Sequence, residues 1–166
     1  LYSSAASDVY KRQIDQLRLF ISKFDNFKDI LEKKFDSNEL TFSRYLGIAE
    51  QVFLAGLDNL ESYYLAIKSV SAVDVDNLKL RLKELDKTQQ SIEIEALEKR
   101  LKIYQQQLEK VNELKQQNEI ALTELDNVTS KLANVQTKKG MADIDMELAM
   151  EELGRMAQRA EKYKTN

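Results

Sequence analysis

One long stretch of this sequence contains none of the residues that normally interrupt a helix. Between Ser91 and Lys139 there is neither proline nor glycine. The apolar residues of the stretch recur at alternating steps of four and three, which is typical of the buried seam of a helix packed lengthwise on other helices. A helix of this length would run roughly 70 Å, longer than a compact domain of this size is wide. The seam residues are Leu97, Leu101, Tyr104, Leu108 and Val111.

The composition favours an all-α fold with a single domain. The chain has 166 residues, of which 32% are charged and 8% are aromatic, with four glycines and no proline. Abundant Leu, Glu, Lys and Gln with few chain-breaking residues is typical of long, solvated helices. We therefore predict one all-α domain over residues 14–166, a helical bundle with a long coiled-coil helical hairpin in its C-terminal half.

The missing residue types exclude several kinds of site. With no histidine and no cysteine, the chain cannot form a Ser-His-Asp triad, a thiolate nucleophile, a disulfide or a zinc site with His or Cys ligands. The net charge of −3 and the lack of a basic segment argue against nucleic-acid binding. No run approaches the length of about eighteen apolar residues that predicts a membrane span. We expect no enzymatic activity, no cofactor and no metal ion.

The first thirteen residues, LYSSAASDVYKRQ, differ in character from the rest of the chain. They resemble the peptide that arises when a sequencing-library adaptor is translated in frame with a gene fragment. The alternative is a genuine leading segment rich in Ser and Ala. We interpret residues 1–13 as non-native, and we expect the native N-terminus and any targeting or membrane segment to be missing. The rest of the protein is expected in the cytoplasm, or associated with a membrane through that missing segment.

Two helices are predicted ahead of the long stretch. The first covers residues 14–35, and we expect its apolar face to pack in a core. The alternative is that this helix anchors the protein at a membrane surface. The mixed charges of its polar face disfavour that alternative. The second, residues 41–70, is apolar over more than one stripe, which predicts a helix at the centre of the bundle. The apolar face of the first helix consists of Leu17, Phe20, Ile21, Phe24, Phe27 and Leu31.

Two glycines and three tyrosines stand out within residues 41–70. Gly47 and Gly56 each cost about 1 kcal/mol relative to Ala inside a helix, so we expect a neighbouring helix to approach closely at both positions. Tyr45, Tyr63 and Tyr64 could line a ligand site. Tyrosines at helical spacing more often pack in a core with the hydroxyl at its rim.

Polar connections separate further predicted helices at residues 75–86, 91–139 and 143–163. Residues 36–38, Asp-Ser-Asn, have turn chemistry that ends the first helix or caps the second. Asp74 or Asp76 is the predicted N-cap of the short helix, and Ser91 is that of the long one. Lys138-Lys139-Gly140 predicts the end of the long helix. Small residues in the last helix would let it approach the long helix closely and complete a helical hairpin.

The seam of the long helix has one irregularity and one polar member. Leu108, Val111 and Leu114 are spaced by three and three, which predicts a local stammer where the seam rotates. Farther along, Asn118 lies on the seam and Leu125 continues it. A polar seam residue can fix register or oligomeric state. The alternative is an Asn tilted towards solvent beside the stammer.

One acidic cluster suggests metal binding. Asp143, Asp145 and Glu147 could bind Ca²⁺ or Mg²⁺, but the cluster lacks the length and the central glycine of an EF-hand loop. Acidic residues are also expected in the first turn of a helix because of the helix dipole. We therefore predict no metal site here.

The order of these elements resembles one bacterial family. A Tyr/Leu-rich helix from Arg44-Tyr45-Leu46 to Tyr63-Tyr64 precedes the long charged helix, and a turn then leads to the helix start at Asp143, Asp145 and Glu147. Over roughly residues 42–163 the chain is similar to proteins labelled "5-bromo-4-chloroindolyl phosphate hydrolysis", which occur beside toxic-anion (tellurite) resistance proteins. The resemblance implies a helical accessory protein of an envelope or metal-anion stress system. Because this sequence supplies no nucleophile and base for phosphate hydrolysis, the activity in the label is not carried over. A second resemblance, to membrane-remodelling phage-shock proteins, rests on long helical hairpins.

These observations predict a non-enzymatic scaffold or interaction protein. It would bind a helical protein partner or a second copy of itself through coiled-coil contacts. The alternative is a peripheral membrane protein of the phage-shock type whose Phe-rich first helix lies on lipid. The sequence leaves open whether the long helix pairs within the chain or between chains. The predicted partner-binding residues are Leu97, Leu101, Tyr104, Leu108, Val111, Asn118 and Leu125.

Overall fold

The computed structural model describes residues 2–85, 91–136 and 143–162, with side chains described between residues 11 and 159 of these ranges. Within them the chain forms α-helices and no strand, which confirms the predicted all-α helical bundle. The helices are α1 (Tyr2–Lys34), α2 (Leu40–Val70), α3 (Val75–Glu84), α4 (Ser91–Asn134) and α5 (Ile144–Lys162).

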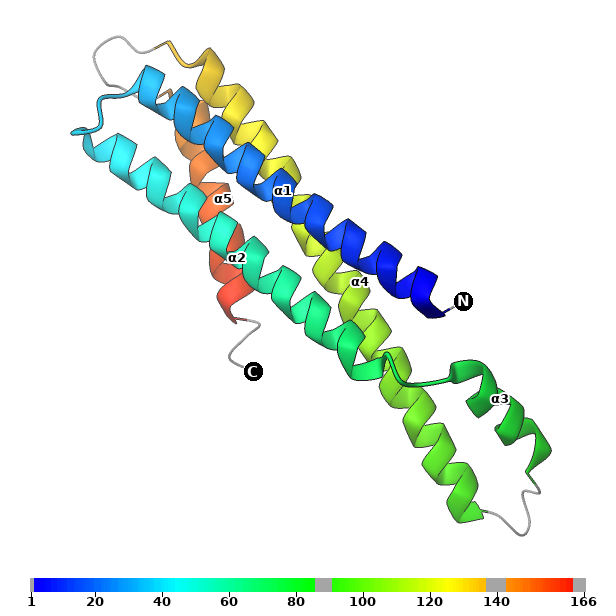
Figure 1. Ribbon diagram of the computed structural model, residues 1–166. Helices are drawn as coiled ribbons and strands as arrows, with labels where there is room; N and C mark the ends of the chain where they lie inside the picture. The colour runs from blue at the N-terminus through cyan, green and yellow to red at the C-terminus, as the bar shows by residue number, and fades with distance from the viewer. Residues whose placement is uncertain (1, 86–90, 137–142, 163–166) are drawn as a thin grey trace.

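Helices α2 and α4 form the centre of the bundle. α1 and α5 each pack on both of them, and no α1–α5 contact is found among the described residues. α1 and α4 run parallel, while α2 runs antiparallel to both (Figure 1). The side-chain pairs Gln16–Glu119 and Lys23–Asp126 each join α1 to α4 across 103 positions, which fixes the register of the parallel pair.

Helix α3 and the first part of α4 project beyond the bundle (Figure 1). We refer to α3 with residues 91–108 of α4 as the extension. In it, Leu78 of α3 and Leu97 of α4 are buried, and Arg81 pairs with Glu93 at 2.5 Å. Asp74 caps α3 by accepting a hydrogen bond from the backbone N–H of Asn77 at 3.0 Å. The extension is therefore two helices thick, whereas the bundle contains four.

The core is built from aromatic and aliphatic side chains of α1, α2, α4 and α5. Phe24 of α1 stacks on Phe53 of α2 with ring centroids 5.0 Å apart. A Cβ atom at Gly56 would lie 2.5 Å from the ring of Phe20, so the expected close helix approach is confirmed there. A Cβ atom at Gly47 would have no atom of another helix within 4 Å, so the same explanation is wrong for that glycine. Fully buried core residues include Phe20, Phe27, Leu31, Tyr45, Leu125, Leu132 and Leu153.

Several helix boundaries, and the extent of the buried face of α1, differ from the prediction. α1 extends back through the segment interpreted as adaptor-derived, to Tyr2; its origin stays a prediction. Leu17 and Ile21, predicted to be in the core, are 37% and 45% exposed, because α1 turns only a narrower stripe towards α2 and α4. α3 ends at Glu84 instead of residue 86.

The long helix ends at Asn134 instead of Lys139. Its last turn tightens there, since the Val135 N–H donates to the carbonyl oxygen of Leu132 at 3.2 Å. The side chain of Asn134 also donates to the carbonyl oxygen of Ser130 at 3.0 Å. The predicted stop at 138–140 lies outside the described residues.

Two predicted caps can be compared with the structure. The residue before α2 is Glu39, which makes no side-chain cap, so none of residues 36–38 caps that helix. Asp36 instead closes the turn by accepting a hydrogen bond from the backbone N–H of Asn38 at 2.9 Å. Ser91 is the first helical residue of α4, and the residue before it lies outside the described ranges.

The buried face of α4 keeps one register along the helix. Val111, Asn118, Leu125 and Leu132 follow one another at intervals of seven residues, and all are buried. This spacing contradicts the predicted rotation of the seam at Leu114, because a rotated seam would have moved the buried face to other positions.

Candidate functional site

The predicted partner-binding residues divide into two groups in the structure. Val111, Asn118 and Leu125 are buried within the chain's own bundle, and Leu97 is buried in the extension. The other three, Leu101, Tyr104 and Leu108, lie in the extension between Leu97 and the start of the bundle at Val111. We name these three residues the distal seam.

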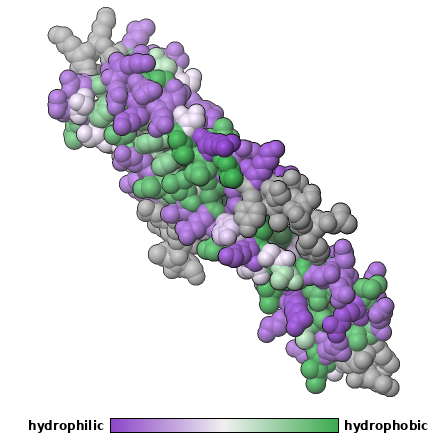
Figure 2. Space-filling model, viewed as in Figure 1, coloured by the Kyte–Doolittle hydropathy of each residue, from purple (hydrophilic) through white to green (hydrophobic). Residues whose placement is uncertain are grey.

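The distal seam is only partly covered by the rest of the chain. Leu101 and Tyr104 are half-buried, and Leu108 is 39% exposed. The ten-residue α3 packs on α4 and lies beside its first part in the extension (Figure 1). Nearby apolar side chains on the extension, Leu80 and Ile103, are also exposed. Figure 2 shows apolar residues at the surface of the extension as well as of the bundle.

A cluster of side-chain amides joins three helices at the centre of the bundle. Asn118 of α4 is 2% exposed, so it faces the interior and is not tilted towards solvent. Its Oδ1 accepts a hydrogen bond from Nδ2 of Asn59 in α2 at 3.1 Å. Its Nδ2 donates to Oε1 of Gln16 in α1 at 3.4 Å. Asn59 Nδ2 also donates to Oε1 of Gln117 at 3.3 Å. We call Gln16, Asn59, Gln117 and Asn118 the amide cluster.

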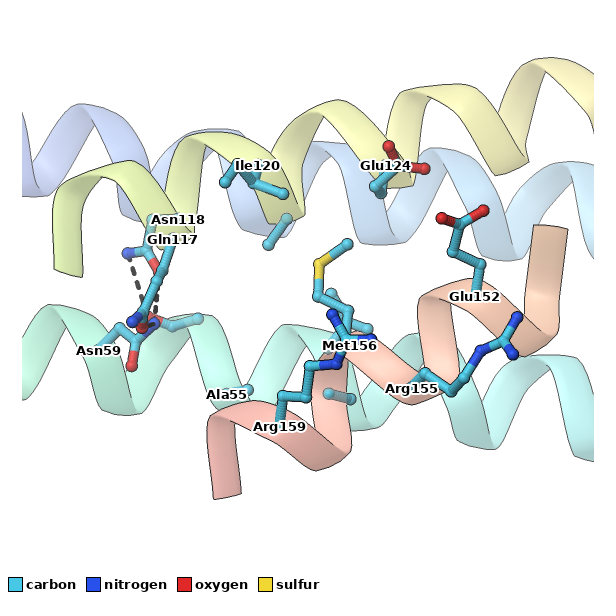
Figure 3. Close-up of a pocket in the computed structure, with 14 residues that line it drawn as sticks. Ala55, Asn59, Gln117, Asn118, Ile120, Glu124, Glu152, Arg155, Met156 and Arg159 are labelled. Atoms are coloured by element: carbon cyan, nitrogen blue, oxygen red, sulfur yellow. Dashed lines mark hydrogen bonds between the residues drawn. The ribbon is translucent and has the colours of Figure 1, made fainter. Parts of the chain in front are cut away.

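A half-open cavity of about 490 Å³ lies beside the amide cluster, between α2, α4 and α5. Its central walls are apolar or small, and Asn59, Gln117 and Asn118 line one end of it. Figure 3 shows the Met156 side chain extending into the space between α5 and α4. We name this space the bundle cavity. Its apolar and small wall residues are Val52, Ala55, Gly56, Ile120, Ala121, Met156 and Ala157.

At the other end of the bundle, α2 is tied to α5 by a tyrosine and an ion pair. The hydroxyl of Tyr45 donates to Oε1 of Glu147 at 2.8 Å, and Arg44 pairs with the other carboxylate oxygen of Glu147. Burial, together with the hydrogen bond to Glu147 and its negative charge, raises the pKa of Tyr45 well above its ordinary value. Phe35 packs edge-on against the Tyr45 ring. The buried phenol therefore has a structural role in this arrangement.

The acidic cluster at the start of α5 is divided between different partners. Glu147 is held by Arg44 and Tyr45, while Asp143 accepts from the backbone N–H of Asp145 at 3.4 Å. In the described part of the chain, no group of three acidic side chains is arranged to hold a metal ion.

The phenylalanines of α1 face the interior. Phe20 and Phe27 are buried, as is Phe35 directly after the helix, and Phe24 is half-buried against Phe53. Their rings are therefore not available to a lipid surface in this conformation. No helix within the described ranges is long and apolar enough to cross a membrane.

Sequence reasoning identified Asn118 but missed its partners. Asn59 interrupts the apolar pattern of α2, which is a signal that could have paired it with the polar seam residue of α4. The bundle cavity has no comparable signal, because it arises from the packing of three helices that are far apart in the sequence.

Comparison of the chain with protein-family models, curated proteins and solved structures gives no match. The resemblance to the toxic-anion resistance family therefore stays a hypothesis that rests on short sequence features.

Proposed function

We propose that this protein is a non-enzymatic helical interaction protein that binds other helices through the distal seam of its extension. The proposed partner is a second copy of the same chain. The observation that carries it is the partial exposure of Leu101, Tyr104 and Leu108 on a seam that is buried at both ends.

Packing energetics support a helical partner at this position. A ten-residue helix is too short to be stable alone in water, so α3 depends on its contacts with α4. With ten residues, α3 is too short to cover the whole seam of the extension, whereas helices of a second copy could complete coiled-coil-like packing around it. Burying one leucine of the distal seam against a partner would contribute about 1.5–3 kcal/mol.

The residue composition also supports an interaction role over an enzymatic one. The chain has no histidine or cysteine. Tyr45, one of two tyrosines whose pKa is raised by burial, is buried and donates a hydrogen bond to Glu147. An accessory role in a bacterial envelope or toxic-anion stress system is compatible with such a protein and rests on the family resemblance alone.

Light scattering over a concentration series tests the proposal. We expect the average mass of the full chain to rise from monomer to dimer. Leu108→Lys, which places a charge on the distal seam, should weaken the association at least tenfold, as loss of about 1.4 kcal/mol or more implies.

Leu148→Lys is the matched control. Leu148 lies on α5 and is 55% exposed, so this variant carries the same change in charge and apolarity away from the extension. It should associate as the unmodified chain does. A monomer at every concentration, or equal weakening by both substitutions, would contradict self-association through the distal seam.

A further inference from the structure

In the bundle, the chain's own helices already occupy the space in front of the seam of α4. Helices α1, α2 and α5 all pack on α4, and the seam residues Val111, Asn118 and Leu125 are buried there. In the extension, by contrast, Leu108 is 39% exposed. A second copy of α4 can therefore reach the seam only between the tip of the helix at Ser91 and the start of the bundle.

The bundle restricts the direction in which a second α4 can lie on the distal seam. Helices whose seams touch have axes about 8–10 Å apart, whereas a single intervening helix is about 10–12 Å across. Two copies in parallel would bring their bundles to the same level, and the helices around each α4 would hold the two seams apart. Two antiparallel copies place each bundle beyond the tip of the other, because the extension projects from one end of the bundle (Figure 1).

The length of the extension also fits an antiparallel overlap. With Leu101 opposite Tyr104 of the partner subunit, Tyr104 lies opposite Leu101 of the partner subunit, so two apolar layers form at the centre. Leu108 then lies at the level of the partner's Leu97, where α3 and α4 of the other extension meet. The tip of each α4 ends within one turn of the start of the other bundle. The whole distal seam is thereby covered without a collision of the bundles.

The charged side chains that flank the seam favour the same direction. In a parallel coiled coil, flanking residues of neighbouring heptads face each other, which would bring Glu93 of each copy opposite Glu98 of the other. Like charges in such positions disfavour a pairing. In the antiparallel overlap Arg100 instead faces the uncharged Gln107 of the partner subunit. Because Arg81 already pairs with Glu93 at 2.5 Å, the like-charge repulsion is weaker than the exclusion caused by the bundles.

We propose that two copies of the chain pack antiparallel on their distal seams and form a rod with one bundle at each end. The proposal rests on the self-association proposed above and adds its direction. Helix α4 has 44 residues, so one copy spans about 70 Å and the overlapped pair spans about 95 Å. Such a dimer presents the same bundle surface at both ends of the rod.

Small-angle X-ray scattering of the full chain over a concentration series tests the direction. The forward scattering gives the mass of the particle, and the distribution of interatomic distances gives its largest dimension. We expect the mass to double while the largest dimension rises by about 30 Å. A doubled mass with an unchanged largest dimension would overturn the antiparallel direction and leave self-association standing. A monomer mass at every concentration would overturn both.

Two charge substitutions at Gln107 provide a second readout. In the antiparallel dimer, Gln107→Glu places a carboxylate opposite each Arg100 of the partner subunit, and Gln107→Lys places an ammonium group there. We expect the dissociation constant of the dimer to fall about threefold for Gln107→Glu and to rise about threefold for Gln107→Lys, because each dimer contains two such surface pairs. In a parallel dimer Gln107 would face Asn112 of the partner subunit, and the two substitutions would not differ.

Gln106→Glu and Gln106→Lys are the matched controls. Gln106 is exposed and lies on the face of α4 that the heptad pattern turns away from the seam. These variants carry the same changes in charge and should dimerise as the unmodified chain does. Equal effects of the two substitutions at Gln107, or effects of the same size and opposite sign at Gln106, would overturn the proposal.

Discussion

At the scale of single residues, Tyr45 shows how a polar group can be buried without loss of stability. Its ring packs against Phe35 while its hydroxyl donates to Glu147, so the core gains apolar area and the phenol keeps a partner. Glu147 in turn is paired with Arg44. The same contact holds α5 to α2.

Replacing Tyr45 with Phe should change how stability depends on pH. The pKa of the folded-state phenol is raised above its ordinary value of 10.0, so the stabilisation from the neutral phenol is fully present below pH 10 and is lost as the pH rises above it. Tyr45→Phe should lower stability by about 1–2 kcal/mol near neutral pH, because a hydrogen bond to a charged group is lost.

Urea unfolding at several pH values from neutral to strongly alkaline measures this effect. Above pH 10 the stability of Tyr45→Phe should fall less steeply than that of the unmodified chain. If stability falls equally steeply with pH in the two proteins, Tyr45 does not control the loss of stability above pH 10.

At the scale of the helices, two glycines in α2 have opposite surroundings. A side chain at Gly56 would collide with the Phe20 ring, while Gly47 has open space around it. Gly56→Ala should therefore destabilise the bundle by about 1–2 kcal/mol through overpacking. Gly47→Ala should stabilise it by about 0.5–1 kcal/mol, because alanine is the better helix former. Thermal unfolding of both variants checks these signs, and a stabilising Gly56→Ala would contradict the close approach of α1.

The sequence predicted the helices well because apolar periodicity and the absence of proline act locally. It could not predict that Leu17 and Ile21 are exposed, since that depends on how narrow a stripe of α1 meets α2 and α4. The end of α4 was placed too late because Lys138-Lys139-Gly140 is a stronger local signal than Asn134. For the candidate site, Asn118 was recognised as unusual, but the amide cluster needed the three-dimensional pairing of α1, α2 and α4.

At the scale of the whole molecule, the chain combines a four-helix bundle with a thinner extension (Figure 1). In the bundle, α4 is covered by α1, α2 and α5, so its seam there is part of the core. In the extension the same seam reaches solvent at Leu108. A single helix thus serves as a core element at one end and as the proposed binding surface at the other.

Amide hydrogen exchange at two protein concentrations tests the central claim most directly, because it reports on each part of α4 separately. We predict that amides around Leu101 and Leu108 become more protected at the higher concentration, that those around Leu125 do not change, and that Leu108→Lys removes the effect. Protection that is the same at both concentrations along the whole of α4 would show that no second copy covers the distal seam.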